Sequence, residues 1–519
     1  MDIIIRNVEV FDGRGAPAFR ADVGLEGDRI AEIGDLSAAT AGTAIDGAGL
    51  AAAPGFIDMH SHSDFTLPIN PRAESKVRQG VTTEVIGMCG ASPAPIDPIS
   101  GESVMASHPD LPWTWNTFGQ YLDYLRQQGL AVNVVPMVGH SMIRGTGMGL
   151  ADRAPTADEM TAMKRLVAQA MEEGAWGLST GLIYPPSAYA TADEIVELSR
   201  VVAERGGFYF SHIRGEAETL LDAVAEAIQI GQRAGLPVQI AHFKAGKPEN
   251  WSLLPQALAL LDDARTRGLD VAADRYPYVA SSTGLSAQLP HWAHDGGRTV
   301  LLERLQLPDV RQRILADLAA RSPHWDKIVI THSPNCPEFE GLNVAEIAAQ
   351  RGADPAETAL DILLVGEARV SVVHFGMSEE NLRAVLRHPA VMIGSDGSAR
   401  IPEGPLGEGK AHPRSYGTFP RVLGKYVREE GVLSLPEAVR KMSGLPAERL
   451  GLSDRGRLAK GMKADVTLFN PETVRDRATF IEPYQYPAGI AYVFVNGQAV
   501  VTPQGHSGAL PGEILAHHR

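Results

Sequence analysis

The apolar and polar positions of residues 54–457 repeat one pattern, in which a short apolar run is followed by a longer amphipathic segment. The short runs are typical of buried β-strands, and the longer segments space their apolar residues as α-helices do. Within Ala157–Glu173, for example, Met160, Met163 and Val167 fall at helical spacing. The apolar runs are Phe56–Met59, Thr83–Met88, Val132–Val138, Gly177–Leu182, Phe208–Ser211, Val238–Ala241, Val271–Ala273 and Val391–Ser395.

Strands that alternate with helices favour a parallel sheet, and eight of them predict an α/β fold of the (β/α)8 TIM-barrel type. About 279–389, between the seventh and eighth runs, the chain has further β runs and helices of its own. We predict that this insertion caps the barrel mouth. In such barrels the functional residues lie at the C-terminal ends of the strands.

The two ends of the chain predict a second, smaller unit. Asp2–Phe11 alternates apolar and polar residues, and near the other end Asn496-Gly497 separates two β runs as a strong hairpin signal. We therefore predict one composite β domain from residues 1–53 and 458–519, beside a barrel domain of residues 54–457.

Composition narrows the classes of partner and the cellular setting. With 44% hydrophobic and 21% charged residues among 519, the chain is ordinary for a globular protein, and its net charge of −15 argues against nucleic acid and anionic membranes as partners. No run approaches the roughly 20 apolar residues of a membrane helix, and the N-terminus lacks the pattern of a secretory signal. Two cysteines make no disulfide framework and favour the cytoplasm. The oligomeric state is not indicated.

Metal-ligating and acidic side chains follow five of the eight apolar runs. They are His60, His62, Cys89, His212, His242 and Asp396. A lone His-x-His pair or a Gly-Ser-Asp-Gly turn is common in proteins without a metal, but together at successive strand ends they predict one shared site. Because thiolate and imidazole favour zinc over magnesium or calcium, the sequence predicts one or two zinc ions there.

Several longer motifs resemble a known family. They are the segments Pro54–Asp64, Gly80–Gly90, Ser211–Glu216, Ala241–Lys244, Tyr276–Thr283, Ile393–Gly397 and His412–Gly424. Over nearly its whole length the chain resembles the D-aminoacylases, the N-acyl-D-amino-acid deacylases of the amidohydrolase superfamily. The His-x-His pair marks only the superfamily, whereas the segments around Cys89 and Arg414 are more specific to this subgroup.

The resemblance implies a particular division of the metal ligands. Cys89, His212 and His242 would hold one tightly bound zinc, and His60 and His62 would hold a second, weaker metal. Many superfamily members bridge two metals with a carboxylated lysine on strand four, but the fourth run of this chain contains no lysine. This difference agrees with a thiolate ligand and argues against a typical hydantoinase or dihydroorotase.

The resemblance also implies the reaction, which is hydrolysis of an N-acyl-D-amino acid to a D-amino acid and a carboxylate. Asp396 would be the general base that takes a proton from water and passes it to the leaving amine. The small-molecule substrate has a free carboxylate, for which the family pattern implies the binding residues Lys244, Tyr276, Ser282 and Arg414.

Alternatives remain open for the site and for the substrate. Asp396 could be a turn or helix-capping residue, and the residues of the carboxylate set could be structural or solvated. The enzyme could act on a cyclic amide or on another N-acyl compound, and a non-catalytic scaffold of the same fold would be expected to lack metal ligands. We assign no role to Cys336 and no metal to His140, and we expect His291 and Trp292 in the insertion to meet the substrate side chain.

Overall fold

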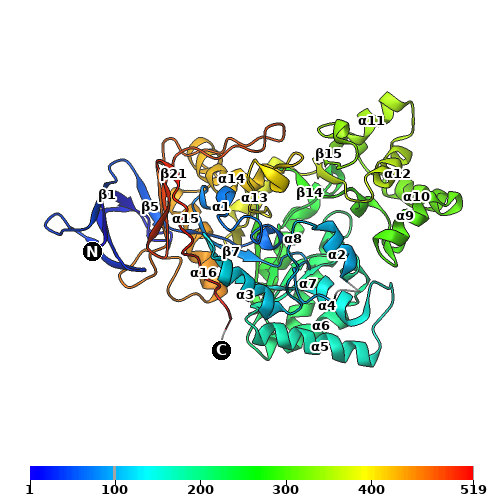
Figure 1. The fold of residues 1–519 in the computed structure, drawn as a ribbon, viewed down its shortest axis with the longest axis horizontal. Helices are drawn as coiled ribbons and strands as arrows, with labels where there is room; N and C mark the ends of the chain where they lie inside the picture. The colour runs from blue at the N-terminus through cyan, green and yellow to red at the C-terminus, as the bar shows by residue number, and fades with distance from the viewer. Residues whose placement is uncertain (98–100, 518–519) are drawn as a thin grey trace.

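A ring of parallel strands lies at the centre of the computed structural model, which describes residues 1–97 and 101–517 (Figure 1). The ring strands are β6 (Phe56–Asp58), β7 (Val81–Ile86), β8 (Asn133–Pro136), β9 (Val138–Gly139), β10 (Gly177–Gly181), β11 (Phe208–His212), β12 (Val238–Ile240), β13 (Val271–Arg275) and β17 (Val391–Ile393). β8 and β9 are consecutive parts of the third strand, and a parallel bridge between Ser61 and Gly397 closes the ring beside β6. The predicted barrel fold is confirmed.

Helices accompany the barrel strands. They are α1 (Glu74–Val77), α2 (Glu102–Ser107), α3 (Phe118–Gln128), α4 (His140–Met148), α5 (Ala157–Glu172), α6 (Ala192–Ala203), α7 (Leu220–Ala234), α8 (Leu254–Thr266), α13 (Glu379–Arg387), α14 (Arg414–Arg421), α15 (Leu435–Met442) and α16 (Gly444–Leu450). α5 begins where Thr156 and Glu159 form a reciprocal capping box, a device that stabilises a helix start by about 1 kcal/mol. In the described part of the chain, no helix has the length and apolarity needed to cross a membrane.

Strands from both ends of the chain share one nine-stranded sheet. They are β1 (Ile3–Val10), β2 (Phe19–Glu26), β3 (Arg29–Gly34), β4 (Thr43–Asp46), β5 (Ala51–Pro54), β18 (Val466–Phe469), β19 (Ile490–Val495), β20 (Gln498–Thr502) and β21 (Gly505–His506). The antiparallel pairing of β5 with β18 joins the two ends. We propose on this basis that residues 1–53 and 458–519 form one domain and residues 54–457 another.

The insertion before β17 has its own small sheet and core. β14 (Ser281–Gly284), β16 (Ser371–His374) and β15 (Ile328–His332) form an antiparallel sheet in that order. The helices beside it are α9 (Arg298–Gln306), α10 (Pro308–Arg321), α11 (Val344–Arg351) and α12 (Pro355–Val365), at the upper right of Figure 1. β14 and the start of α9 line a cavity together with barrel residues, which supports the proposal that the insertion caps the mouth.

Candidate metal centre and active site

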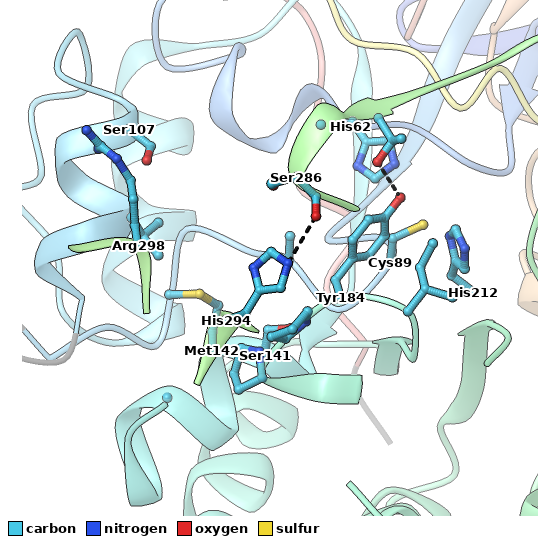
Figure 2. A pocket seen from close by; sticks show the side chains of 18 of the residues that line it. His62, Cys89, Ser107, Ser141, Met142, Tyr184, His212, Ser286, His294 and Arg298 are labelled. Atoms are coloured by element: carbon cyan, nitrogen blue, oxygen red, sulfur yellow. Dashed lines mark hydrogen bonds between the residues drawn. The ribbon is translucent and has the colours of Figure 1, made fainter. Parts of the chain in front are cut away.

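The predicted ligands converge at the C-terminal ends of the barrel strands. Their donor atoms form two groups, within each of which all atoms lie within 4.8 Å of one another. One group contains Cys89, His212 and His242, and the other contains His60, His62, Cys89 and Asp396. Cys89 belongs to both groups, and Figure 2 shows it close to His62 and His212. Nitrogen, sulfur and oxygen donors at this spacing fit zinc, with one thiolate shared between two positions.

Cys89 has the environment of a thiolate. Its Sγ lies 3.4 Å from His60 Nε2 and 3.8 Å from His242 Nε2. Burial opposes ionisation, but the charge of His60 and hydrogen bonds from His212 and His242 outweigh it, and the pKa of the Cys89 thiol is held well below its usual value. Because the thiolate is the metal-binding form of cysteine, the site favours a metal ion.

Three of the candidate residues have a left-handed backbone conformation, which residues other than glycine rarely adopt. The φ angles are 53° at Cys89, 34° at His242 and 52° at Asp396. Such residues cost about 1–3 kcal/mol each and persist where the surrounding structure holds them. Before Cys89, a Cβ at Gly87 would lie 1.9 Å from the carbonyl oxygen of Met137, so only glycine fits there.

A buried carboxylate, Asp274, and a half-buried one, Glu216, hold the imidazoles of predicted ligands, and neither is among the site residues predicted from the sequence. Asp274, at the end of β13, lies 3.1 Å through Oδ1 from His60 Nδ1 and accepts the backbone N–H of His242. Glu216 Oε1 lies 2.9 Å from His242 Nδ1. Carboxylates in these positions fix the ring that binds a metal and raise its basicity. Asp274 directly follows the seventh apolar run, Val271–Ala273, so its place in the sequence resembles that of the predicted ligands.

Lys244 faces Glu216 as well as the cavity. Its Nζ forms an ion pair with Glu216 and lies 2.8 Å from His242 Nδ1. Burial alone would favour a protonated Glu216, but Lys244 and then His242 hold the pKa of that carboxyl well below its usual value. Lys244 lines the cavity, and its binding of a substrate carboxylate stays a prediction.

Replacing Glu216 with glutamine is expected to weaken zinc binding about 10- to 100-fold. The neutral amide lacks the negative charge that raises the basicity of the His242 imidazole. Zinc affinity measured by competition with a chelator tests this. Glu218→Gln is the matched control, since Glu218 lies in the same loop and pairs with Lys247 at the surface. Equal affinities for the Glu216 and Glu218 variants would contradict the role of Glu216.

Asp396 lies between the histidine pair and an arginine. Its Oδ1 is 3.0 Å from His62 Nε2 and 3.4 Å from His60 Nε2, and its Oδ2 is 2.7 Å from Arg414 Nη1. Burial raises the pKa of the carboxyl, but Arg414 and the two histidines outweigh it and hold that pKa well below its usual value. The carboxylate is therefore ionised, which is the state that a general base requires before it acts.

The predicted carboxylate-binding residues include two buried polar atoms without a hydrogen-bond partner. Among the described residues, neither the Tyr276 hydroxyl nor Arg414 Nη1 has a hydrogen-bond acceptor. Arg414 is close to Asp396, but its N–H geometry makes that contact an ion pair and not a hydrogen bond. The guanidinium lies 4.9 Å from the centre of the Tyr276 ring. Because an unsatisfied buried donor costs about 1–3 kcal/mol, these two atoms favour an incoming hydrogen-bond acceptor.

A cavity of about 720 Å³ has Ser282, Lys244, Arg414 and Asp396 in its wall, whereas Tyr276 is not among its described lining residues. Much of the remaining wall is apolar, including Phe65, Met142, Leu150, Ile183 and Leu301. The prediction for His291 and Trp292 is wrong, because neither lines the cavity among the described residues. Trp292 instead packs within the insertion, and its Nε1 donates to Asp317.

Comparison with known proteins identifies the family. A model of the Amidohydrolase family matches residues 43–501. An N-acyl-D-glutamate deacylase of Alcaligenes xylosoxydans xylosoxydans is 40% identical over 99% of this chain and 96% of its own length.

Two solved structures are similar over 99% of both chains, each with 38% identity. One is an N-acyl-D-glutamate deacylase of Bordetella bronchiseptica with zinc and a phosphonate that mimics the tetrahedral intermediate (TM-score 0.86). The other is a D-aminoacylase with a binuclear metal centre, in which one metal activates and the second attenuates (TM-score 0.85). This protein belongs to the D-aminoacylase, or N-acyl-D-amino-acid deacylase, family of the amidohydrolases.

Proposed function

We propose that this protein is a zinc-dependent hydrolase that cleaves the amide bond of N-acyl-D-amino acids to give a D-amino acid and a carboxylate. The observation that carries the proposal is the meeting of metal ligands, Asp396 and Arg414 in one cavity. The relatives named above act on N-acyl-D-amino acids, and the cavity has the groups that such a substrate requires.

We assign the tightly bound zinc to Cys89, His212 and His242, and a second, weaker metal position to His60 and His62. Zinc there would supply Lewis-acid activation of a water molecule and of the amide carbonyl. Glu216 would keep the metal-binding nitrogen of His242 turned toward the tight position, and Asp274 would do the same for His60 at the weaker one.

Asp396 would carry the proton transfers. Its ionised Oδ1 accepts a proton from the attacking water and later gives that proton to the nitrogen of the departing amine. The second transfer matters because an unprotonated amine is a poor leaving group. The ion pair with Arg414 keeps the carboxylate in place between the two steps.

The free carboxylate of the substrate would bind to Arg414, Tyr276, Ser282 and Lys244. Arginine suits a planar carboxylate because it donates two parallel hydrogen bonds. This set also bears on the alternative substrate, because a cyclic amide has no general need for such a cluster of donors. The two free cysteines are consistent with a cytoplasmic setting for the enzyme, which we also propose.

A panel of N-acetyl-D- and N-acetyl-L-amino acids, with zinc measured in the same sample, tests the proposal. We expect amine release from D-substrates and little release from their L-enantiomers, together with loss of activity after zinc is chelated and its return when zinc is restored. Hydantoin and dihydroorotate serve as the cyclic controls. Activity on L-substrates alone, or on the cyclic amides alone, would refute the assignment.

A further inference from the structure

A chain of hydrogen bonds leads from the cavity wall into the protein, outside the metal cluster. Ser141, the second residue of α4, lines the cavity, and its Oγ lies 2.9 Å from Ser187 Oγ. Ser187 Oγ lies 2.7 Å from His140 Nδ1, and His140 Nε2 lies 3.1 Å from Glu194 Oε1. Ser187, His140 and Glu194 are all buried, whereas Ser141 is half-buried and labelled on the cavity wall in Figure 2.

The charges at the buried end of the chain fix the state of its imidazole. Arg144 Nη1 lies 2.7 Å from both oxygens of Glu194, so the two form a neutral pair. Burial opposes ionisation, but a hydrogen bond from His140 and the charge of Arg144 lower the pKa of Glu194. An ionised carboxylate only accepts hydrogen bonds, so His140 Nε2 must donate. In its neutral form, which adds no charge to the balanced pair of Arg144 and Glu194, the ring accepts at Nδ1.

The proton positions of both serines follow from that imidazole. Ser187 must give its single proton to His140 Nδ1, so the proton between the two serines belongs to Ser141. A serine hydroxyl in water can rotate to donate or to accept. Ser141 has already donated inward, and only its lone pairs face the cavity.

The two serines lie directly beside the residue that follows the shared metal ligand. A Cβ at Gly90 would lie 3.1 Å from Ser141 Oγ and 3.2 Å from Ser187 Oγ, and the backbone N–H of Ser141 donates to the Gly90 carbonyl oxygen. Met142 and Ile183, in the wall of the same cavity, are apolar. Ser141 thus offers one acceptor on a largely apolar wall, in the cavity that also contains Cys89.

We propose that Ser141 is a specificity-determining residue that accepts a hydrogen bond from an N–H or O–H group on the substrate, carried by the amino-acid side chain or by the acyl group. Ser187, His140 and Glu194 are positioning residues that keep Ser141 an acceptor. The inference rests on the proposed deacylase function and adds a substrate preference to it. A donor-bearing group is favoured over a group of the same shape without a donor about 3- to 10-fold in kcat/KM, as one neutral hydrogen bond allows.

Paired substrates on the zinc-loaded enzyme test the proposal. For the side chain, N-acetyl-D-tryptophan is compared with its benzothienyl analogue, and N-acetyl-D-glutamine with N-acetyl-D-methionine. For the acyl group, N-glycolyl-D-leucine is compared with N-propionyl-D-leucine. We expect the donor member to be favoured in one of these arms by wild type, and that preference to disappear in Ser141→Ala and to shrink in Ser187→Ala, which releases the Ser141 proton.

Matched variants separate this role from a structural one. Ser199→Ala removes a buried hydroxyl from α6, the helix that carries Glu194, and is expected to keep the preference. Ser141→Thr retains a hydroxyl and is expected to restore the preference in part. Thermal melting identifies any variant that does not fold. If Ser187→Ala or Ser199→Ala fails to fold, the comparison of Ser141→Ala with Ser141→Thr decides whether Ser141 sets the preference.

Two outcomes would overturn the inference. One is the absence of any donor preference in wild type. The other is an equal fall of kcat/KM on both members of every pair in Ser141→Ala, as a merely structural serine would give. If wild type hydrolyses none of these N-acyl-D-amino acids, the proposed function itself is refuted and the inference with it, and that result is distinct because the donor-free substrates also fail.

Discussion

Replacing Asp396 with alanine is expected to lower kcat for hydrolysis of an N-acyl-D-amino acid at least ~10²-fold while the tightly bound zinc stays in place. The carboxylate lies 3.0 Å from His62 Nε2 among the predicted metal ligands and is ionised beside Arg414, as a base must be before it takes a proton from water. It is absent from the group formed by Cys89, His212 and His242, so its loss leaves that group intact. Single-turnover kinetics and zinc analysis on one sample measure both quantities.

Two further variants make the result specific to proton transfer. Asp396→Asn keeps the shape of the side chain but cannot accept a proton, so it is expected to lose as much rate as the alanine variant. Asp110→Asn removes an exposed carboxylate from the wall of a second cavity next to the first, and this variant is expected to retain wild-type kcat. Turnover near wild type in Asp396→Ala, with zinc retained, would refute the role of Asp396 as the base.

The barrel could be predicted because its strands are buried on both faces. Such strands read as nearly continuous apolar runs, and each of the eight runs coincides with a strand of the ring to within a few residues. The hairpin between β19 and β20 could also be predicted, because its turn requires a left-handed backbone, and Asn496 and Gly497 have φ angles of 46° and 81°. These features depend on local sequence and on strand burial alone.

Only those site residues could be predicted that directly follow an apolar run, because that position places them at the C-terminal end of a barrel strand. Glu216 and Asp274 contact histidines that are distant from them in the sequence, so the sequence alone does not show which imidazole each carboxylate holds. Lys76 is fully buried against Asp58, where its Nζ lies 2.8 Å from Oδ2, yet a lone lysine in a sequence indicates an exposed residue. His291 and Trp292 were misplaced because the orientation of the insertion depends on tertiary packing.

Replacing Cys89 with alanine is expected to remove most of the zinc from the purified protein. Cys89 is common to both groups of ligand atoms, so its loss leaves two imidazoles at the first position and no sulfur at either. The lost ligand is also the one whose negative charge offsets the metal, since its pKa is held well below the usual value by His60 and then by His212 and His242, against the effect of burial. Elemental analysis of the purified variant measures the loss, and activity is expected to fall with the zinc content.

Two variants decide whether the loss belongs to this ligand. Cys336→Ala removes the other free cysteine, which is buried in the core of the insertion, and is expected to keep its zinc. His62→Ala removes a ligand of the second group only, so it should lose far less zinc than Cys89→Ala. Full zinc content in Cys89→Ala would refute the thiolate ligand, and equal losses in Cys89→Ala and His62→Ala would refute the division into a tight and a weaker position. The shared thiolate makes the order of these losses informative, because one atom serves both positions whereas His62 serves only the second.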